Sequence, residues 1–138
     1  MPTARPASTL LLIYPDAHGE LTVPLTVRRP DLRAHAGEVS LPGGSVDPGD
    51  ATREAAALRE AHEEIGVAPE LVTIVGTLDD IWIPVTNFEL RPFVGAAERR
   101  PLLVPQDREV AAIVDALHTV QAADHLAAVG AGPDLCER

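Results

Sequence analysis

The residues best suited to chemistry are three carboxylates close together in the chain, Glu60, Glu63 and Glu64. In a helix, positions i, i+3 and i+4 are neighbours, and like charges there repel each other. These glutamates fall near the C-terminal end of the predicted helix, where the helix dipole also disfavours negative charge. A divalent cation would offset both penalties, and oxygen ligands favour Mg²⁺ or Mn²⁺. The spacing therefore predicts a metal site.

A glycine–proline loop, Leu41-Pro42-Gly43-Gly44, precedes this helix. The backbone carbonyl of Gly44 could add a further oxygen to the ligands of the metal. Carboxylates around such an ion suit phosphoryl chemistry, because the metal activates water, neutralises phosphate charge and orients the leaving group. The alternative is a solvated acidic face. The nearby loop, and the position of the glutamates at the unfavourable end of the helix, favour the metal site.

The helix is predicted to run from Ala51 to Ile65, with Asp50 as its N-cap and Gly66 as its C-terminal stop. At about 100° per residue, one face should pack on the core. That face holds Ala51, Ala55, Leu58, Ala61 and Ile65. The glutamates lie on the opposite face, beside Arg53, Ala56 and Ala57, and the small alanines would leave room for a ligand. Arg59 falls between the two faces, where it could bind the glutamates or the loop.

The whole chain has 138 residues, which suits one domain, residues 1–138, with a single core. Its net charge is −10, and all 11 basic residues are arginine. An acidic surface argues against nucleic-acid binding, which needs a basic footprint. We find no apolar run near the roughly 20 residues of a membrane span, no leader-like segment, and a single cysteine, Cys136. These features lead us to expect a cytoplasmic protein.

Several segments outside the helix have the alternation or the apolar character of strands. Thr9–Tyr14 and Leu21–Val27 flank a turn and should form a hairpin. The remaining predicted elements are strands at Glu70–Leu78, Phe88–Gly95 and Glu109–Val114, a loop or short strand at Asp79–Asn87, and a helix at Thr119–Val129. This mixture predicts an α+β sandwich with helices on the faces of a mixed sheet.

Two segments together resemble a known family. Arg59-Glu-Ala-His-Glu-Glu-Ile-Gly-Val67 is similar to the core of the Nudix box, Arg-Glu-apolar-x-Glu-Glu-x-Gly-apolar. Upstream, Leu25 to Gly44 resembles the further signature of the coenzyme A diphosphatase subgroup. That signature has Leu-Thr-x-Arg, then Arg-x-x-x-Gly, then an apolar residue and Pro-Gly-Gly. The combined match covers Leu25 to Val67.

The resemblance implies a Nudix α/β/α sandwich with a mixed β-sheet between helices. It also implies hydrolysis of a nucleoside diphosphate derivative. For the subgroup this is coenzyme A or its thioesters, which give 3′,5′-ADP and 4′-phosphopantetheine. By matching position, Glu60, Glu63 and Glu64 would be ligands of Mg²⁺ or Mn²⁺, and one of them could be the base for the attacking water. Arg59 would orient the glutamates, and Gly44 would lend its carbonyl.

Further site residues follow from the matched positions. Arg28 and Arg33 could bind substrate phosphate, since arginine suits bidentate phosphate contacts. Gly43 and Gly44 belong to the same substrate-binding loop. Glu109 could be an additional metal ligand or base, and the alternative for it is a surface glutamate at the start of a strand.

The chain departs from the family pattern in three places. The general box has glutamate where this chain has Ala51, while Asp50 follows Gly44 at the matching distance, a shift that the subgroup tolerates. Arg29 stands where the subgroup usually has a small residue. The chain ends at Arg138, where subgroup members usually continue through an aromatic-containing segment that helps to form the pocket.

The short C-terminus leaves other functions open. One is a diphosphatase that acts on ADP-ribose, a dinucleotide or a nucleoside triphosphate. Another is a module that binds a nucleotide without turning it over, although a pure binder has no need of three clustered carboxylates. Trp82 could stack on adenine or serve packing. A homodimer would cover the surfaces that the short termini leave.

Overall fold

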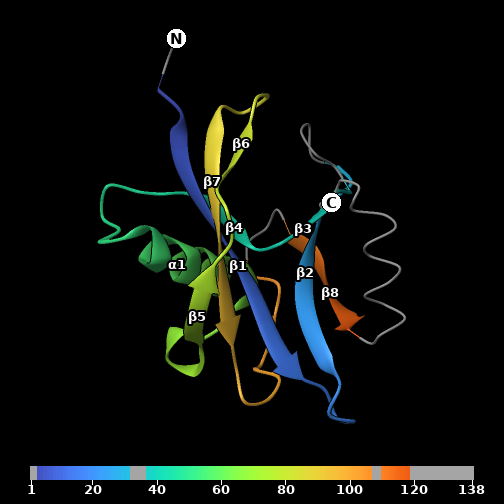
Figure 1. The fold of residues 1–138 in the computed structure, drawn as a ribbon. Coiled ribbons are helices and arrows are strands. Elements are labelled where there is room, and N and C mark those ends of the chain that lie inside the picture. The colour runs from blue at the N-terminus through green and yellow to red at the C-terminus, as the bar shows by residue number, and fades with distance from the viewer. Residues whose placement is uncertain (1–2, 32–36, 107–109, 119–138) are drawn as a thin grey trace.

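The structure is a computed structural model that describes residues 3–31, 37–106 and 110–118. Figure 1 shows the strands with the helix Arg53–Ile65 beside them. The elements are β1 (Arg5–Pro15), β2 (Leu21–Arg28), β3 (Val39–Ser40), β4 (Gly43–Ser45), α1 (Arg53–Ile65), the 3₁₀ helix η1 (Pro69–Leu71), β5 (Thr73–Thr77), β6 (Ile81–Ile83), β7 (Phe88–Ala96) and β8 (Val110–His118). The strands form a mixed sheet and α1 packs against it, which confirms the predicted α+β class.

The sheet has the order β3-β2-β1-β7-β5, with β4 added on β1, β6 on β7 and β8 on β2. The central strands β1 and β7 run parallel, and the other pairs are antiparallel. β1 and β2 pair at their hairpin ends, Tyr14 with Thr22 and Pro15 with Leu21. Beyond those ends the two strands diverge, so the sheet opens into two parts that share β1 (Figure 1).

One face of β1 packs on α1 and forms the core. Leu10, Leu12 and Tyr14 alternate along the strand and are buried. They meet a helix stripe whose members recur every four residues, Ala57, Ala61 and Ile65, with Val67, Phe93 and Leu103 around them. Because inward positions repeat every two residues in a strand and about every four in a helix, this packing fixes the rotation of α1 about its axis. That rotation sets the direction in which the glutamates of α1 face.

The N-terminus of α1 differs from the prediction. The Thr52 hydroxyl accepts a hydrogen bond from the Ala55 amide at 3.0 Å, and the helix begins at Arg53. The prediction of Asp50 as N-cap and Ala51 as the first helical residue was therefore wrong. Both Asp and Thr can cap a helix, but the carboxylate of Asp50 is bound to a side chain instead, as described below. The predicted C-terminus is confirmed, since Gly66 ends α1 with φ of 77°.

The buried face of α1 is also rotated relative to the prediction. Ala56 and Ala57, which were placed beside the glutamates, are fully buried, whereas Ala51 is exposed and precedes the helix. Alanine contributes little to hydrophobic periodicity, so a helix this rich in alanine does not define its own buried face sharply. The room that the two alanines were expected to leave beside the glutamates is therefore not there.

The remaining elements follow the sequence with local changes. The strand predicted at Glu70–Leu78 is divided into η1 and β5, and the Leu71 amide donates to the Ala68 carbonyl at 3.0 Å in the 3₁₀ turn. Trp82 lies in β6, and β8 extends to His118. The helix predicted at Thr119–Val129 falls outside the described residues. Within the described ranges, α1 included, no helix has both the length and the apolar character needed to cross a bilayer.

Candidate functional site

Arg59 connects α1 to the loop that precedes it. Its Nε and Nη2 atoms donate to the two carboxylate oxygens of Asp50, at 2.9 and 3.0 Å. The Asp50 side chain is only 6% exposed. The hydrogen bonds from Arg59 lower the pKa of Asp50, and the same pairing raises the pKa of Arg59. The pair therefore carries both of its charges at neutral pH and fixes the guanidinium.

The fixed guanidinium also holds the loop and the helix carboxylates. Arg59 Nη2 donates to the carbonyl of Ser45 at 3.1 Å, and Nη1 donates to Glu63 Oε1 at 3.1 Å. Glu60 Oε2 lies 3.4 Å from Nη2. Arg59 thus contacts two of the three glutamates, and its role in orienting them stays a prediction.

Glu60 lies directly against the glycine loop. A Cβ atom added to Gly44 would be 2.5 Å from Glu60 Oε2 and 2.8 Å from its Cδ. The Glu60 side chain is 16% exposed, much less than that of Glu63, which is 53% exposed. The structure therefore brings Gly44 and Glu60 together, as the proposed sharing of a metal requires.

The charge at Glu60 is poorly compensated in the protein alone. Burial raises the pKa of Glu60, and the nearby Glu63 and Asp47 carboxylates add to this, while Arg59 and a hydrogen bond from Glu64 oppose it. Glu60 and Glu64 are close enough to share a hydrogen bond when one of them is protonated, and as carboxylates they would be oxygen donors that a hard cation stabilises. The donor chemistry around Glu60 and Glu64 therefore fits Mg²⁺ or Mn²⁺.

The three glutamates do not all converge in this structure. Among the residues that the structure describes, no group of three or more potential ligands is gathered closely enough to hold a metal ion. Glu60 meets Glu64, whereas Glu63 turns toward Arg59. The role of Glu63 as a ligand, and the assignment of the base, therefore stay predictions.

The other predicted site residues lie in part outside the described ranges. Gly43 packs tightly on β1, since a Cβ there would be 2.3 Å from the Ser8 carbonyl oxygen. Arg28 ends β2 opposite Val110, next to an irregularity in the β2–β8 pairing. Arg33 and Glu109 are outside the described residues.

A strap formed by Leu103–Gln106 crosses the C-terminal end of α1. The amides of Val104 and Gln106 donate to the carbonyls of Ile65 and Glu64, each at 2.9 Å. These are carbonyls that the end of a helix leaves without an intrahelical partner. The strap is thereby tied to the glutamate end of α1. Sequence reasoning missed the strap, because it carries no motif.

The contacts of Arg53, which hold α1 in place, were also not predicted from the sequence. Its Nη2 atom donates to the carbonyls of Ala7 at 3.0 Å and Glu89 at 2.6 Å, and its Nη1 atom contacts Glu89 Oε1 at 3.4 Å. Arg53 thus fastens the first turn of α1 to both parallel central strands. Its partners are distant in the sequence, and no local signal points to them.

Trp82 is half exposed, and its Nε1 donates to Asn87 Oδ1 at 3.0 Å. The indole lies on the β6–β7 hairpin and not in the core. Both the packing and the base-stacking interpretations of Trp82 stay predictions.

A comparison with protein families identifies the family of this domain. The model of the NUDIX domain matches residues 4–133. The chain belongs to the NUDIX family. The matched range of this Nudix domain includes the loop, α1 and both central strands, so the site described above lies within the family's own domain.

Curated relatives of the Nudix chain carry the name "Uncharacterized Nudix hydrolase NudL". The protein of Klebsiella pneumoniae (strain 342) is 54% identical over 71 residues, which are 51% of this chain and 36% of that protein. The protein of Enterobacter sp. (strain 638) is 44% identical over 91 residues, which are 66% of this chain and 47% of that protein. The match thus spans less than half the length of these two relatives.

Solved structures confirm the Nudix fold. The Nudix hydrolase RenU of M. smegmatis has a TM-score of 0.71 and 28% identity, covering 96% of this chain and 89% of RenU. The Nudix domain of Shewanella oneidensis NrtR, solved with ADP ribose, has a TM-score of 0.65 and 17% identity, covering 91% of this chain and 79% of that chain. At 17% identity, the similarity to NrtR shows a shared fold and nothing more.

Proposed function

We propose that this chain hydrolyses the diphosphate linkage of coenzyme A or its thioesters, with Mg²⁺ or Mn²⁺, to 3′,5′-ADP and 4′-phosphopantetheine. The hydrolase part rests on one observation, the contact of the buried Glu60 carboxylate with Gly44. A second acidic side chain, Glu64, is close enough to Glu60 to share a hydrogen bond when one of the two is protonated. This places oxygen donors of the helix beside the loop backbone, as a site for a hard cation and a diphosphate needs.

Each residue has a stated task in this proposal. Glu60, Glu64 and the Gly44 carbonyl would hold the metal, and Glu63 would be either a further ligand or the base for the attacking water. The bound metal neutralises phosphate charge and activates water. Arg59 keeps Glu63 and the loop in place through its bonds to Asp50 and Ser45. Glu109, which follows the strap in the sequence, would be a further ligand or base.

The choice of coenzyme A rests on the signature between Leu25 and Gly44. In the structure its two ends are joined, because Thr26 Oγ1 donates to the Ser40 carbonyl at 3.2 Å, and β3 leads into the glycine loop. This pairing supports a role for Arg28, and for Arg33 in the segment between, in binding phosphate. A cytoplasmic location and a homodimer belong to the same proposal.

A substrate panel tests the proposal. Coenzyme A, ADP-ribose, NADH, a diadenosine polyphosphate and dGTP are each incubated with Mg²⁺ and with Mn²⁺, and products are separated by chromatography. We expect release of 3′,5′-ADP from coenzyme A by the wild-type chain. We expect Glu63→Gln and Glu64→Gln to abolish it, and Glu54→Gln, an exposed glutamate in the first turn of α1, to retain it.

The other outcomes separate the alternatives. Cleavage of another compound, lost in the same two variants, would keep the metal-dependent mechanism and replace the substrate. Nucleotide binding without cleavage of any compound, with metal still bound, would replace the hydrolase by a binding module.

A further inference from the structure

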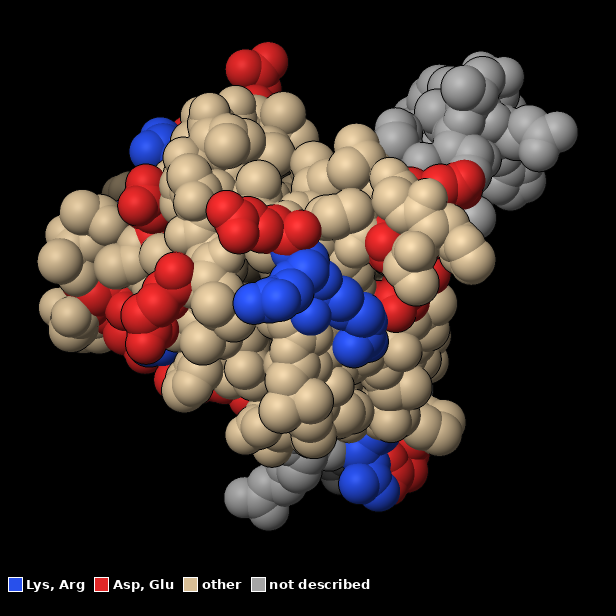
Figure 2. Space-filling model, turned by 90° about the horizontal axis from the view of Figure 1, so that it is seen from below, with Lys and Arg blue, Asp and Glu red and all other residues tan. Residues whose placement is uncertain are grey.

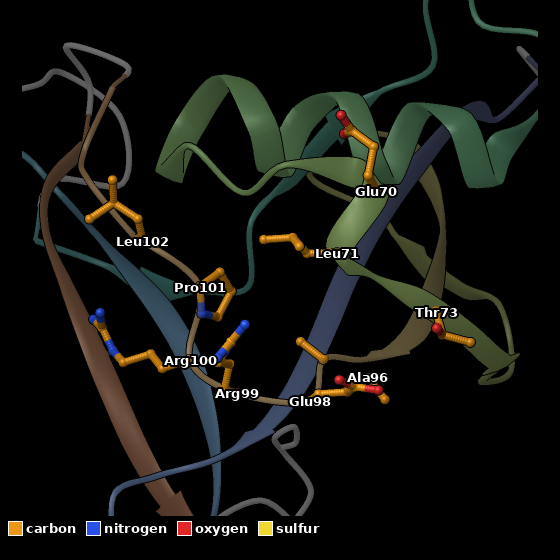
Figure 3. A pocket seen from close by; sticks show the side chains of 10 residues that line it. Glu70, Leu71, Thr73, Ala96, Glu98, Arg99, Arg100, Pro101 and Leu102 are labelled. Atoms are coloured by element: carbon orange, nitrogen blue, oxygen red, sulfur yellow. The ribbon is translucent and has the colours of Figure 1, made fainter.

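A pocket of ≈ 570 Å³ opens between two segments at the C-terminal ends of α1 and β7. Glu70, Leu71 and Thr73 form one wall, and residues 96–102 form the other (Figure 3). Small-molecule pockets typically measure roughly 300–1,000 Å³. Neither Gly44 nor any of the glutamates of α1 lines it. The proposed diphosphatase chemistry therefore leaves this pocket unused.

Arg100 gives the pocket a rigid charged edge. Its Nε donates to Asp115 Oδ2 at 3.1 Å, and the other oxygen of Asp115 accepts a hydrogen bond from the buried Tyr14 hydroxyl. Arg100 is therefore anchored through β8 to the core strand β1. In Figure 3 its guanidinium points toward β8, away from the centre of the pocket.

Arg99 is different, because its guanidinium points into the pocket, toward Leu71 (Figure 3). It forms no ion pair or hydrogen bond with any residue that the structure describes. This is unusual in a chain of net charge −10, in which Glu98 is its immediate neighbour. Figure 2 shows a continuous basic patch over the segment that follows β7, with acidic side chains beside it. Within the part of the chain that the structure describes, the pocket thus presents a cation without an ion-pair partner.

The walls beside Arg99 are apolar. Leu71 is 54% exposed and Leu102 is 81% exposed, and Pro101 lies between them in Figure 3. Exposed large apolar side chains that gather at a concave surface indicate a binding site. A ligand that covered them would need an uncharged, apolar part next to its anionic group.

The carboxylates of the pocket limit the charge of its ligand. Glu70 and Glu98 lie on the side of the pocket away from Arg100 (Figure 3). A polyphosphate that filled the pocket would bring negative charge to these carboxylates, and like charges repel. A guanidinium matches one carboxylate or one phosphate group with two hydrogen bonds. The charges therefore select a single oxyanion group.

We propose that this pocket is a second ligand site, which binds a small molecule with one oxyanion group, a carboxylate or a phosphate monoester, attached to an apolar ring or chain. The oxyanion binds Arg99, and the apolar part packs on Leu71 and Leu102. The site does not depend on the proposed hydrolase activity, so it is tested by binding and not by turnover.

The test is isothermal titration of the full chain, with a chelator present to remove divalent metal. The probes are phenyl phosphate, benzoate, inorganic phosphate and ATP. The proteins are wild type, Arg99→Gln, Leu102→Ser and the control Arg29→Gln, an exposed arginine bound to Asp31 outside the pocket. All three variants change exposed side chains, so each should fold.

We expect phenyl phosphate or benzoate to bind the wild type more tightly than inorganic phosphate or ATP. Arg99→Gln should weaken the ring-bearing probe about tenfold or more, since a charge-assisted hydrogen-bond pair is lost. Leu102→Ser should weaken that probe but not inorganic phosphate, and Arg29→Gln should change neither. The tighter of the two ring-bearing probes identifies the oxyanion as phosphate or carboxylate.

Three results would overturn the proposal. They are no binding of either ring-bearing probe, equal binding by wild type and Arg99→Gln, and ATP or inorganic phosphate binding as tightly as the ring-bearing probes.

Discussion

Glu60 Oε2 lies 2.5 Å from the place that a Cβ atom on Gly44 would occupy. Positive φ occurs at Gly19, Gly37 and Gly66 and not at Gly44. The absence of a side chain at Gly44 therefore serves the approach of a helix carboxylate and not the backbone conformation. This contact is the point at which α1 and the loop form one site.

Gly44→Ala should reduce activity far more than stability. The new methyl group must displace Glu60 from the loop, and a shift of about 1 Å in a reacting group can lower the rate about 100-fold. We expect a loss of that order in kcat/KM on whichever substrate the wild type cleaves. Steady-state kinetics measure the rate, and thermal unfolding measures stability.

Gly49→Ala is the matched control for that variant. An added Cβ at Gly49 meets nothing within 4 Å. The control should retain wild-type kcat/KM. Full activity in Gly44→Ala would show that the contact with Glu60 has no part in the reaction.

Glu60→Gln should make the metal-free chain more stable at neutral and alkaline pH. Burial raises the pKa of Glu60 in the folded protein above its unfolded value, about 4.3. A raised carboxyl pKa means that the folded state favours the proton, so stability is lost as pH rises from the unfolded pKa through the folded one. The variant avoids this loss.

Urea unfolding with a chelator measures that effect. The gain from Glu60→Gln should be present at about pH 8 and should shrink at about pH 3, where Glu60 is largely protonated in both states. Glu54→Gln, at an exposed position of the same helix, should show no such pH dependence. A variant less stable than the wild type at about pH 8 would contradict the account of Glu60.

Adding Mg²⁺ or Mn²⁺ should raise the midpoint of thermal unfolding. A ligand that binds the folded state alone stabilises it by about 2.7 kcal/mol at a concentration of about 100 Kd. The rise should be smaller in Glu60→Gln and in Glu64→Gln than in the wild type, because each removes a charged oxygen donor. An equal rise in all three proteins would place the metal elsewhere.

Asp50→Asn should destabilise the chain in a pH-dependent way. Hydrogen bonds from Arg59 lower the pKa of Asp50 below its unfolded value of about 3.9. The stabilisation is therefore fully present above the unfolded pKa and is lost as pH falls through the folded one. The difference in unfolding free energy between wild type and variant should be largest near neutral pH and should decline in acid.

Asp47→Asn is the comparison for Asp50. The Asp47 carboxylate lies 3.5 Å from Arg59 Nη2 but is 57% exposed. Exposed ion pairs contribute little, so this variant should change unfolding free energy much less. Similar losses of stability in both variants would mean that Asp47 and Asp50 stabilise the fold together, and not mainly through the pair of Asp50 with Arg59.

Arg53→Lys should lower stability by about 1–3 kcal/mol, because a lysine cannot reproduce a guanidinium that reaches two backbone carbonyls. The carbonyls of Ala7 and Glu89 would each lose their hydrogen bond from Arg53. Arg29→Lys, in an exposed pair with Asp31, should stay near wild type. Urea unfolding compares the two, and an unchanged midpoint for Arg53→Lys would show that Arg53 does not fasten α1.

Local signals in the sequence predicted the parts of the fold that depend on neighbours in the chain. The β1–β2 hairpin follows from two apolar runs around Pro15–Gly19, and the end of α1 follows from Gly66, which takes the left-handed conformation. The spacing of Glu60, Glu63 and Glu64 along α1 can also be read directly from the sequence. These features needed no knowledge of distant contacts, and the structure confirms the hairpin and the helix end.

Features that depend on long-range contacts could not be predicted in the same way. Asp50 and Thr52 are both capable N-caps, and the choice between them is made by the reach of Arg59 to Asp50. The partners of Arg53 lie 46 and 36 residues away. The pocket beside Arg99 is built from two segments, residues 70–73 and 96–102, which are separated in the chain by β6 and most of β5 and β7.

The bond between Asp50 and Arg59 joins residues nine positions apart, across the end of a loop and two turns of a helix. Because the link is made by two side chains, the loop can gain one residue and the Asp50 carboxylate can still bind the Arg59 guanidinium. Pattern searches that fix the interval between the loop acid and the helix arginine will therefore overlook chains built in this way. A search that allows the acid at either of two adjacent positions will retain them.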